Sequence, residues 1–196
     1  MPAPGFIVTR RRSAETTRAA ILEAARCRFS REGYEGAGVR DIAGDAGVDA
    51  ALVSRYFGGK DELFAAVLEL SAKPDELFYG APEEFAARIA ALLVRDPQDD
   101  AKMDCVLIML RSASSPKAAA AIRQFCEARF YGPMVEWLGC ADAAVLSRLL
   151  GALMMGMGVT RAISPDLDLD AAGRKALERR VEAVLLAMLR PSQAAD

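Results

Sequence analysis

Apolar residues recur at helical spacing along almost the whole chain of 196 residues, and no stretch alternates apolar and polar residues over the length of a strand. Hydrophobic residues make up 53% of the chain, which is enough to bury a sizeable core. The strongest apolar stripes lie toward the C-terminal end, in residues 142–163 and in the segment that ends near residue 189. The sequence therefore predicts an all-α protein of one or two domains.

Glycine, proline and capping residues divide the sequence into about nine helices. The expected helices cover residues 13–32, 39–46, 50–57, 60–71, 82–95, 101–113, 116–137, 142–163 and a last segment that ends near residue 189. Gly33 ends the first helix, and the Asp49 carboxylate can cap the third by accepting from an exposed amide. The pair Gly132-Pro133 is expected to kink or split the seventh.

The residue types argue against an enzyme and against a metal or cofactor site. The chain has no histidine, which excludes His-based triads, His general bases and His-ligated zinc. It also has no glycine-rich phosphate loop and no nucleophile elbow. The four cysteines are widely spaced without a C-x-x-C pair, so reduced thiols are expected, and a redox-sensing role for one of them stays open.

Two features bear on localisation. No apolar run approaches the roughly 20 residues that a membrane span needs. Residues 1–8 have neither the charged start nor the apolar length of a signal peptide. The sequence therefore predicts a cytoplasmic protein that does not contact a membrane.

Charge is unevenly distributed, although the net charge is only −2. Residues 1–60 hold ten arginine and lysine residues against seven acidic residues, whereas acidic residues are in excess over the remainder. A basic N-terminal third beside an acidic remainder suggests a nucleic-acid-contacting head on a solvated body.

Residues 39–48 carry the most informative motif of the chain. A short helix, a glycine turn and a capped second short helix have the layout of a helix-turn-helix, in which the second helix enters the major groove of DNA. Ala43 is small where the two helices must approach, and Gly47 can take the positive φ of a tight turn. Val48 can fill the space between the helices.

Residues 14–70 resemble the DNA-binding domain of TetR-family transcriptional regulators. The matching positions are Gly33-Tyr34, Ile42-Ala43, Ala46-Gly47-Val48, Tyr56-Phe57, Lys60 and Leu63-Phe64. The resemblance implies an all-helical subunit with a three-helix DNA-binding domain and a C-terminal helical domain for ligand binding and dimerisation. The expected divisions are a flexible basic arm (1–12), the helix-turn-helix domain (13–59), the effector and dimerisation domain (60–190) and a tail (191–196).

The resemblance also implies roles for individual residues in DNA binding. The expected DNA-binding residues are Arg40, Ala50, Ala51, Ser54, Arg55, Tyr56 and Lys60. Arg40 matches a family position that can reach a base edge, where an arginine can donate two hydrogen bonds to guanine. Tyr56 and Lys60 match positions that touch phosphate and so fix register without reading sequence. The family commonly has tyrosine where this chain has Ser54, so the sequence lacks one aromatic phosphate contact.

In the family, the fifth to eighth helices enclose an effector cavity. The candidate lining residues are Leu107, Leu110, Phe125, Arg129, Phe130, Trp137 and Met154. Arg129 can supply a polar anchor in such a cavity, or can pair on the surface with Glu127 or Glu136. Ordinary core packing is the alternative for the apolar members. The ligand is expected to be a small, largely apolar molecule of unspecified identity.

The last two helices are expected to form the dimer interface, because the resemblance implies a four-helix pairing about a two-fold axis. The expected interface residues are Leu146, Leu149, Leu150, Leu153, Val181, Val184, Leu185 and Met188. The sequence thus predicts a homodimeric repressor that a small effector releases from a pseudo-palindromic double-stranded DNA operator. The alternative is a helical partner-binding protein whose helix-turn-helix no longer binds DNA, which the small side chains of Ala50, Ala51 and Ser54 favour.

Overall fold

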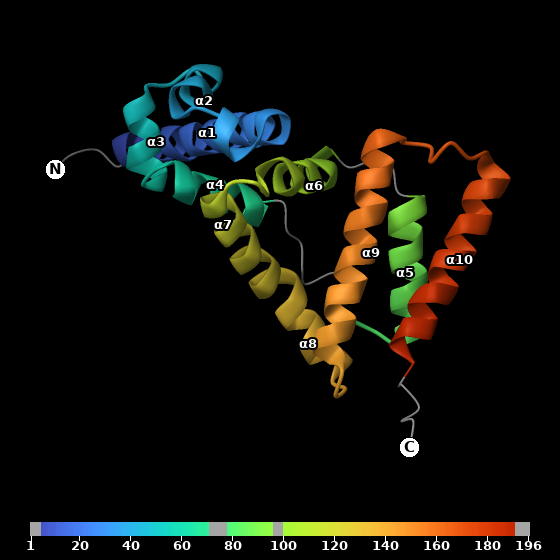
Figure 1. Ribbon diagram of the computed structural model, residues 1–196. Helices are drawn as coiled ribbons and strands as arrows, with labels where there is room; N and C mark the ends of the chain where they lie inside the picture. The colour runs from blue at the N-terminus through green and yellow to red at the C-terminus, as the bar shows by residue number, and fades with distance from the viewer. Residues whose placement is uncertain (1–4, 71–77, 96–99, 191–196) are drawn as a thin grey trace. The chain divides into compact units, whose positions relative to one another are not determined.

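The computed structural model describes residues 5–70, 78–95 and 100–190, with side chains from residue 14 onward except for residues 100–103. Every secondary-structure element within these ranges is helical (Figure 1). The elements are α1 (Gly5–Gly36), α2 (Val39–Asp45), α3 (Ala50–Phe57), α4 (Lys60–Leu70), α5 (Pro82–Val94), α6 (Asp100–Ser112), α7 (Pro116–Cys126), a π-helical segment (Glu127–Tyr131), α8 (Gly132–Leu138), α9 (Ala143–Ile163) and α10 (Ala171–Leu189). The all-α prediction is confirmed for the described part of the chain.

The helices group into two compact units. Unit 1 comprises Met1–Ser71 and Leu107–Arg123, and unit 2 comprises Ala72–Val106 and Gln124–Asp196. This division differs from the expected boundary at residue 59. The reason is that α4 buries its apolar face in unit 1, where Leu63, Phe64 and Val67 are fully enclosed. The division also assigns the turn between α6 and α7 to unit 1.

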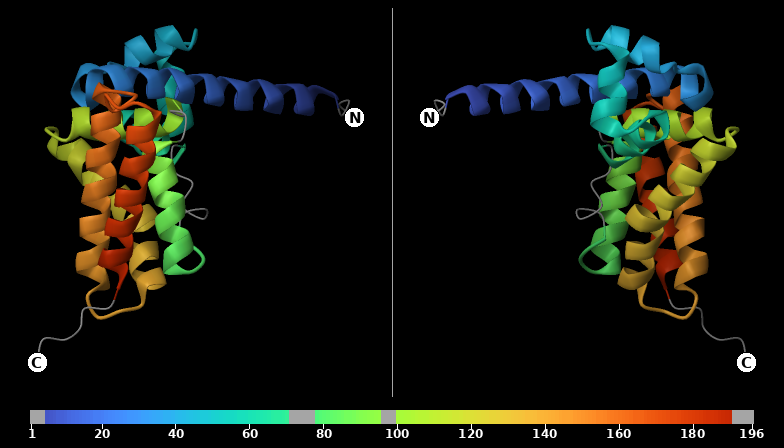
Figure 2. Two further views of the ribbon diagram at one scale, coloured as in Figure 1. Left: turned by 90° about the vertical axis from the view of Figure 1, so that its right-hand side faces the viewer. Right: turned by 90° about the vertical axis from the view of Figure 1, so that its left-hand side faces the viewer.

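Helix α1 is longer than expected at its N-terminal end. It begins at Gly5, so residues 5–12, expected to form a flexible arm, are helical instead, and Figure 2 shows these first turns extending beyond the rest of unit 1. No glycine or proline lies between residues 6 and 32, so nothing in this stretch stops the helix from continuing past Ser13. Residues 1–4 of the expected arm lie outside the described residues.

Three aromatic rings meet in the core of unit 1. Phe29 and Phe64 are fully buried, and their ring centroids lie 5.1 Å apart in an edge-to-face arrangement. The Tyr34 ring lies 5.2 Å from that of Phe64. Edge-to-face contacts of this kind add to the burial energy of the rings. The cluster therefore fixes α4 against α1.

Unit 2 is built around α5, α9 and α10, which lie side by side in Figures 1 and 2. Its core cluster includes the fully buried side chains of Phe85, Ile89, Met134, Leu150 and Leu185. Gly151 allows a close approach within this unit, because a Cβ there would lie 2.8 Å from Cε1 of Tyr131. The core of unit 2 is thus formed by the C-terminal helical stripes.

The expected distortion at Gly132-Pro133 is present. The chain follows a π-helical path over Glu127–Tyr131, and α8 then begins at Gly132. Pro133 lacks the amide hydrogen that a continuous α-helix needs at this point, so the hydrogen-bond pattern shifts before it. The chain therefore stays helical through this segment, and α8 follows the π-helical turn without a loop.

Candidate DNA-binding site and dimerisation surface

The turn between α2 and α3 has the geometry that the motif predicts. Gly47 has φ of 67°, and the amide of Val48 donates to the Ala43 carbonyl at 2.9 Å. Ile42 and Ala43 are buried, so α2 packs inward through these two residues. The Asp49 carboxylate caps α3 by accepting from the Ala51 amide at 2.7 Å. These local contacts fix the direction in which α3 leaves the turn.

The residues expected to contact DNA come from α2, α3 and the first position of α4. Of these, Arg40, Ala51, Ser54 and Arg55 are exposed, whereas Ala50, Tyr56 and Lys60 are partly buried. Val53 is fully buried on the opposite side of α3 and anchors that helix to unit 1. The outward side of α3 therefore carries small side chains and a single arginine, Arg55.

Lys60 is positioned by Tyr34. Its ammonium lies 4.5 Å from the centroid of the Tyr34 ring, which is within range of a cation–π contact. The Tyr34 hydroxyl donates a hydrogen bond to the Asp61 carboxylate, which also pairs with Lys117 at 3.5 Å. Burial, followed by this hydrogen bond, raises the pKa of Tyr34, and the same bond is the main cause of the lowered pKa of Asp61. Tyr34 therefore connects α1 to the start of α4.

Two further contacts attach α1 to the helix-turn-helix. Arg28 donates to Asp45 at the end of α2 at 2.5 Å and to Glu32 at 2.8 Å. The hydrogen bond from Arg28 is the main cause of the lowered pKa of Asp45. The Arg18 guanidinium lies 4.9 Å from the ring centroid of Phe57 at the end of α3. The last residue of α2 and the last residue of α3 are thus each attached to a different arginine of α1.

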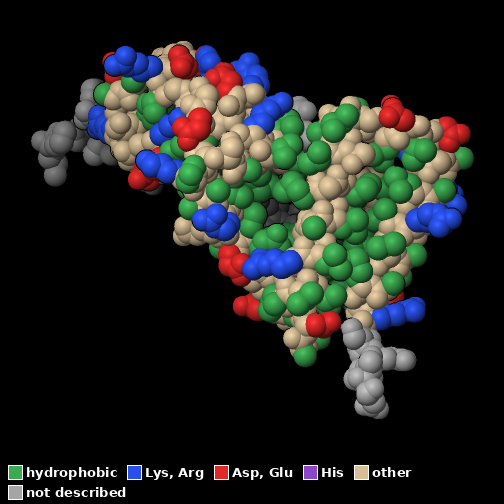
Figure 3. Space-filling view, in the orientation of Figure 1, with side chains coloured by type: hydrophobic (Ala, Val, Ile, Leu, Met, Phe, Trp, Pro, Cys, Tyr) green, Lys and Arg blue, Asp and Glu red, His purple; other side chains and the backbone are tan. Residues whose placement is uncertain are grey.

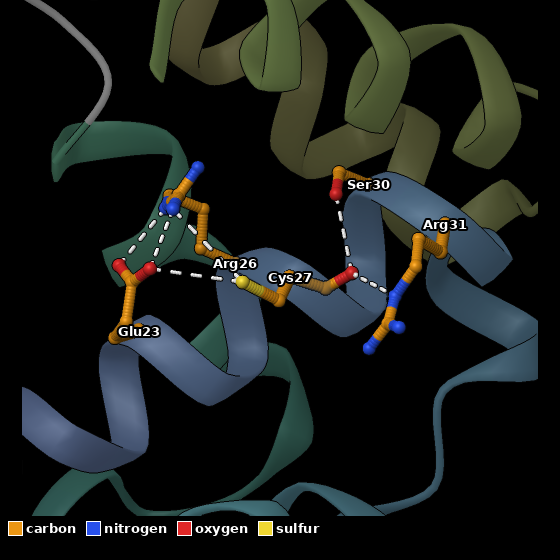
Figure 4. Close-up of polar contacts among 5 residues, drawn as sticks. All are labelled: Glu23, Arg26, Cys27, Ser30 and Arg31. Atoms are coloured by element: carbon orange, nitrogen blue, oxygen red, sulfur yellow. Dashed lines mark hydrogen bonds and ion pairs between the residues drawn. The ribbon is translucent and has the colours of Figure 1, made fainter. Parts of the chain in front are cut away.

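Polar side chains of α1 bond back onto the helix itself (Figure 4). Arg26 pairs with Glu23 at 2.5 Å, and the hydrogen bond from Arg26 is the main cause of the lowered pKa of Glu23. The Cys27 carbonyl accepts from both Ser30 Oγ and Arg31 Nε at 3.1 Å. The last regular turn before Gly33 is therefore reinforced by its own side chains.

The candidate effector residues divide between the two units. Leu107 and Leu110 belong to unit 1, and Leu110 is exposed. In unit 2, Phe130, Trp137 and Met154 pack against the core cluster, Phe125 is partly buried and Arg129 is exposed. Of these candidates, Phe130, Trp137 and Met154 pack against the same core cluster. Glu127, considered as a partner of Arg129, pairs with Arg148 at 2.7 Å.

Unit 2 also contains an aromatic side chain, Phe78, that was not among the candidates from the sequence. Phe78 lies with its ring centroid 5.3 Å from that of Phe130. The Trp137 indole donates to the Gly80 carbonyl at 3.3 Å, and its ring lies 4.6 Å from that of Phe85. No local pattern marks Phe78, because it comes from a segment without regular helical spacing.

The expected dimer-interface residues divide into an outer and an inner group. Leu149 and Val184 are exposed, and Leu146, Leu153 and Met188 are partly buried. Leu150, Val181 and Leu185 lie in the core of unit 2 and do not form a surface, which corrects the expectation for these three. The sides of α9 and α10 that carry these three residues are covered by other helices of the same subunit.

The outer group is extended by two exposed apolar residues that are not among those expected from the sequence. Val145 is 69% exposed and Ile163 is 81% exposed, at opposite ends of α9. Figure 3 shows apolar side chains gathered over α9 and α10. Large contiguous apolar surfaces are uncommon on monomeric soluble proteins and mark interaction sites.

Helix α9 is also long and apolar enough to cross a membrane by length and composition alone, and it is the one described helix that meets this test. The sequence alone predicted no such segment. Its Leu150 is nevertheless packed inside unit 2, and it carries Arg148 and Arg161. Arg161 donates to the carbonyls of Leu92 and Leu93 at the end of α5. Only 17% of the apolar window of α9 is buried, so these contacts hold the helix against unit 2 along one side.

Two protein-family models match the chain. Residues 21–67 match the model described as bacterial regulatory proteins of the tetR family. Residues 83–189 match a model described as a tetracyclin repressor-like C-terminal domain. The first match includes the helix-turn-helix of α2 and α3, and the second runs from α5 to the end of α10.

Sequence relatives match the N-terminal part. The HTH-type transcriptional repressor SCO4008 of Streptomyces coelicolor is 47% identical over 58 residues, 30% of each chain. The HTH-type transcriptional repressor Rv3405c of Mycobacterium tuberculosis is 41% identical over 76 residues, which is 38% of this chain and 40% of that protein. The similarity thus spans less than half of the length of these curated relatives.

Solved structures match nearly the whole chain. NalD of Pseudomonas aeruginosa, described as the secondary repressor of the MexAB-OprM multidrug efflux pump, is 20% identical with a TM-score of 0.70, over 92% of this chain and 99% of NalD. A transcriptional regulator of Rhodococcus sp. Rha1 is 27% identical with a TM-score of 0.62, over 90% and 95%. The likeness to NalD extends the shared fold through both units.

Proposed function

Because the chain belongs to the TetR family of bacterial regulatory proteins, we propose that it is a homodimeric transcriptional repressor that a small apolar effector releases from its DNA operator. The observation that carries this proposal is the capped, outward-facing α3 with exposed Arg55 beside exposed Arg40 of α2. This arrangement suits a recognition helix in the major groove of double-stranded DNA. Such a role implies a cytoplasmic protein.

Base readout and phosphate contacts fall to different residues in this proposal. Arg40 and Arg55 are the two exposed cations of α2 and α3, and an arginine in the groove can donate two hydrogen bonds to guanine. Tyr56 and Lys60 lie at the end of α3 and the start of α4, where they contact phosphate. Ala50, Ala51 and Ser54 leave room for close approach but offer few base contacts.

Dimerisation is proposed through the outer group of α9 and α10. Val145, Leu149 and Val184 are exposed apolar residues that a two-fold copy would cover. A two-fold dimer carries two recognition helices and therefore reads a pseudo-palindrome with half-sites about 34–36 Å apart, or a small multiple of that distance.

The effector is proposed to bind in unit 2 beside the aromatic side chains of Phe78, Phe130 and Trp137, with Met154 as an adaptable neighbour. Rings and a thioether favour a largely apolar ligand. Such a ligand lowers operator affinity only to the extent that it binds the DNA-released conformation more tightly.

Replacing Arg55 with alanine tests the assignment of α3. We expect operator affinity to fall by about tenfold, because losing one arginine contact to a base costs about 1–3 kcal/mol. Fluorescence anisotropy with a duplex selected from a random library measures the change. The matched control is Arg123→Ala, an exposed arginine on α7 outside the helix-turn-helix. Equal affinity of Arg55→Ala and wild type would remove Arg55 from the interface.

A further inference from the structure

The turn between α6 and α7 inserts polar groups against the C-terminal end of α1. Ser112 and Ser115 are 1% and 2% exposed. Ser115 Oγ donates to the Glu35 carboxylate at 2.5 Å, and Arg111 donates to the Ser30 carbonyl. We call Arg111 and Ser112 the clasp. Both belong to unit 1 together with α1.

The clasp replaces one helical hydrogen bond of α1. In an uninterrupted α-helix the amide of Tyr34 would donate to the carbonyl of Ser30, four residues earlier. Here the Tyr34 amide donates to Ser112 Oγ at 3.0 Å, and the Ser30 carbonyl accepts from Arg111. Both halves of the missing bond are therefore satisfied by two adjacent residues of α6. A buried amide or carbonyl without such a partner would be costly.

Gly33 makes this arrangement possible. Its φ of 69° interrupts α1, and a residue with a side chain rarely adopts this backbone conformation. A Cβ at this position would also lie 2.6 Å from the Arg111 carbonyl oxygen. Gly33 therefore lets the end of α1 turn so that the Tyr34 amide and the Ser30 carbonyl meet Ser112 and Arg111.

The clasped arrangement fixes a residue of the proposed DNA interface. Tyr34 is held at its amide by Ser112 and at its hydroxyl by Asp61, and its ring lies beneath the Lys60 ammonium. We propose that the clasp positions Lys60 for its phosphate contact, through Tyr34, and that opening the clasp weakens operator binding. This inference rests on the proposed function and adds a positioning role for Arg111 and Ser112 to it.

The test uses the full chain and an inverted-repeat duplex selected from a random library, with anisotropy measured at several salt concentrations. Ser112→Ala is expected to weaken binding about fivefold, as for the net loss of one hydrogen bond. It is also expected to flatten the salt dependence, with the slope falling by about 0.9 for each lost phosphate contact. Ser114→Ala, an exposed serine of the same turn, is the matched control and keeps the wild-type slope.

A double-mutant cycle with Lys60→Met separates positioning from a general loss of stability. If the clasp acts through Lys60, the double variant binds no more weakly than Lys60→Met alone. Additive losses, or a Ser112→Ala salt slope equal to that of wild type, would overturn the proposal. Ser112→Cys keeps the side-chain size with a weaker acceptor and replaces Ser112→Ala if that variant does not fold.

Hydrogen exchange at the Tyr34 amide distinguishes failure of the clasp from failure of the proposed function. Slow exchange in wild type and faster exchange in Ser112→Ala are expected. Equal exchange in the two proteins contradicts the clasp, whatever the DNA result. If the wild-type chain selects no duplex, the proposed function fails, and the positioning role for Lys60 fails with it.

Discussion

Replacing Phe64 with alanine is expected to destabilise unit 1 by about 3–5 kcal/mol, the usual cost of truncating a buried phenylalanine. Phe64 is fully buried and contacts the rings of both Phe29 and Tyr34. These two contacts join α4 to α1. A loss of this size is a large part of the total stability of a typical domain. Operator binding should be lost with it, because the helix-turn-helix is attached to α1. Urea denaturation followed by far-UV circular dichroism measures the change.

Leu70→Ala is the matched control for Phe64→Ala. Leu70 lies on the same helix but is 54% exposed, so we expect its free energy of unfolding to change by no more than about 0.5 kcal/mol. If Phe64→Ala lost no more stability than Leu70→Ala, the aromatic cluster would not be the attachment between α1 and α4.

Replacing Leu149 with aspartate is expected to convert the dimer to monomer. Leu149 is 52% exposed on α9 and belongs to the proposed interface. A carboxylate buried there without a partner costs about 3–5 kcal/mol, and two-fold symmetry places one on each subunit. Sedimentation analysis at micromolar concentration gives the subunit state directly. Affinity for the inverted repeat should fall by about 100-fold or more, because each monomer holds only one half-site.

Leu70→Asp makes the same apolar-to-acidic change at an exposed leucine of α4 and should remain dimeric. A dimeric Leu149→Asp protein would place the interface elsewhere. The exposed apolar residues of α9 and α10 would then need another partner.

Element boundaries follow closely from local chemistry. Gly33 interrupts α1 by adopting positive φ, and Asp49 caps α3 with its own carboxylate. Pro82 and Pro116 are the first residues of α5 and α7, as expected of a residue without an amide hydrogen. These signals need only neighbouring residues, so sequence alone is sufficient to identify them.

Helix faces are harder to assign, because an apolar side chain can serve the subunit's own core or a second copy equally well. Leu149 and Leu150 are adjacent, yet one is exposed and the other is enclosed by unit 2. Which side faces inward depends on how α5, α9 and α10 pack together, and the spacing of apolar residues does not encode this.

Long-range polar contacts leave no pattern in the sequence. Arg111 and Ser112 bond to Ser30 and Tyr34, which lie about 80 positions earlier. A serine and an arginine at the end of a helix are otherwise unremarkable. The clasp therefore becomes visible only when the two segments are placed together in unit 1.

Selection of bound duplexes from a random library, using protein stripped of small molecules, tests the central claim most directly. We expect enrichment of an inverted repeat that binds two chains, with affinity that falls steeply as salt rises. No enriched sequence from a folded, ligand-free dimer would contradict DNA-binding regulation. That result would favour a helix-turn-helix protein that binds a protein partner instead.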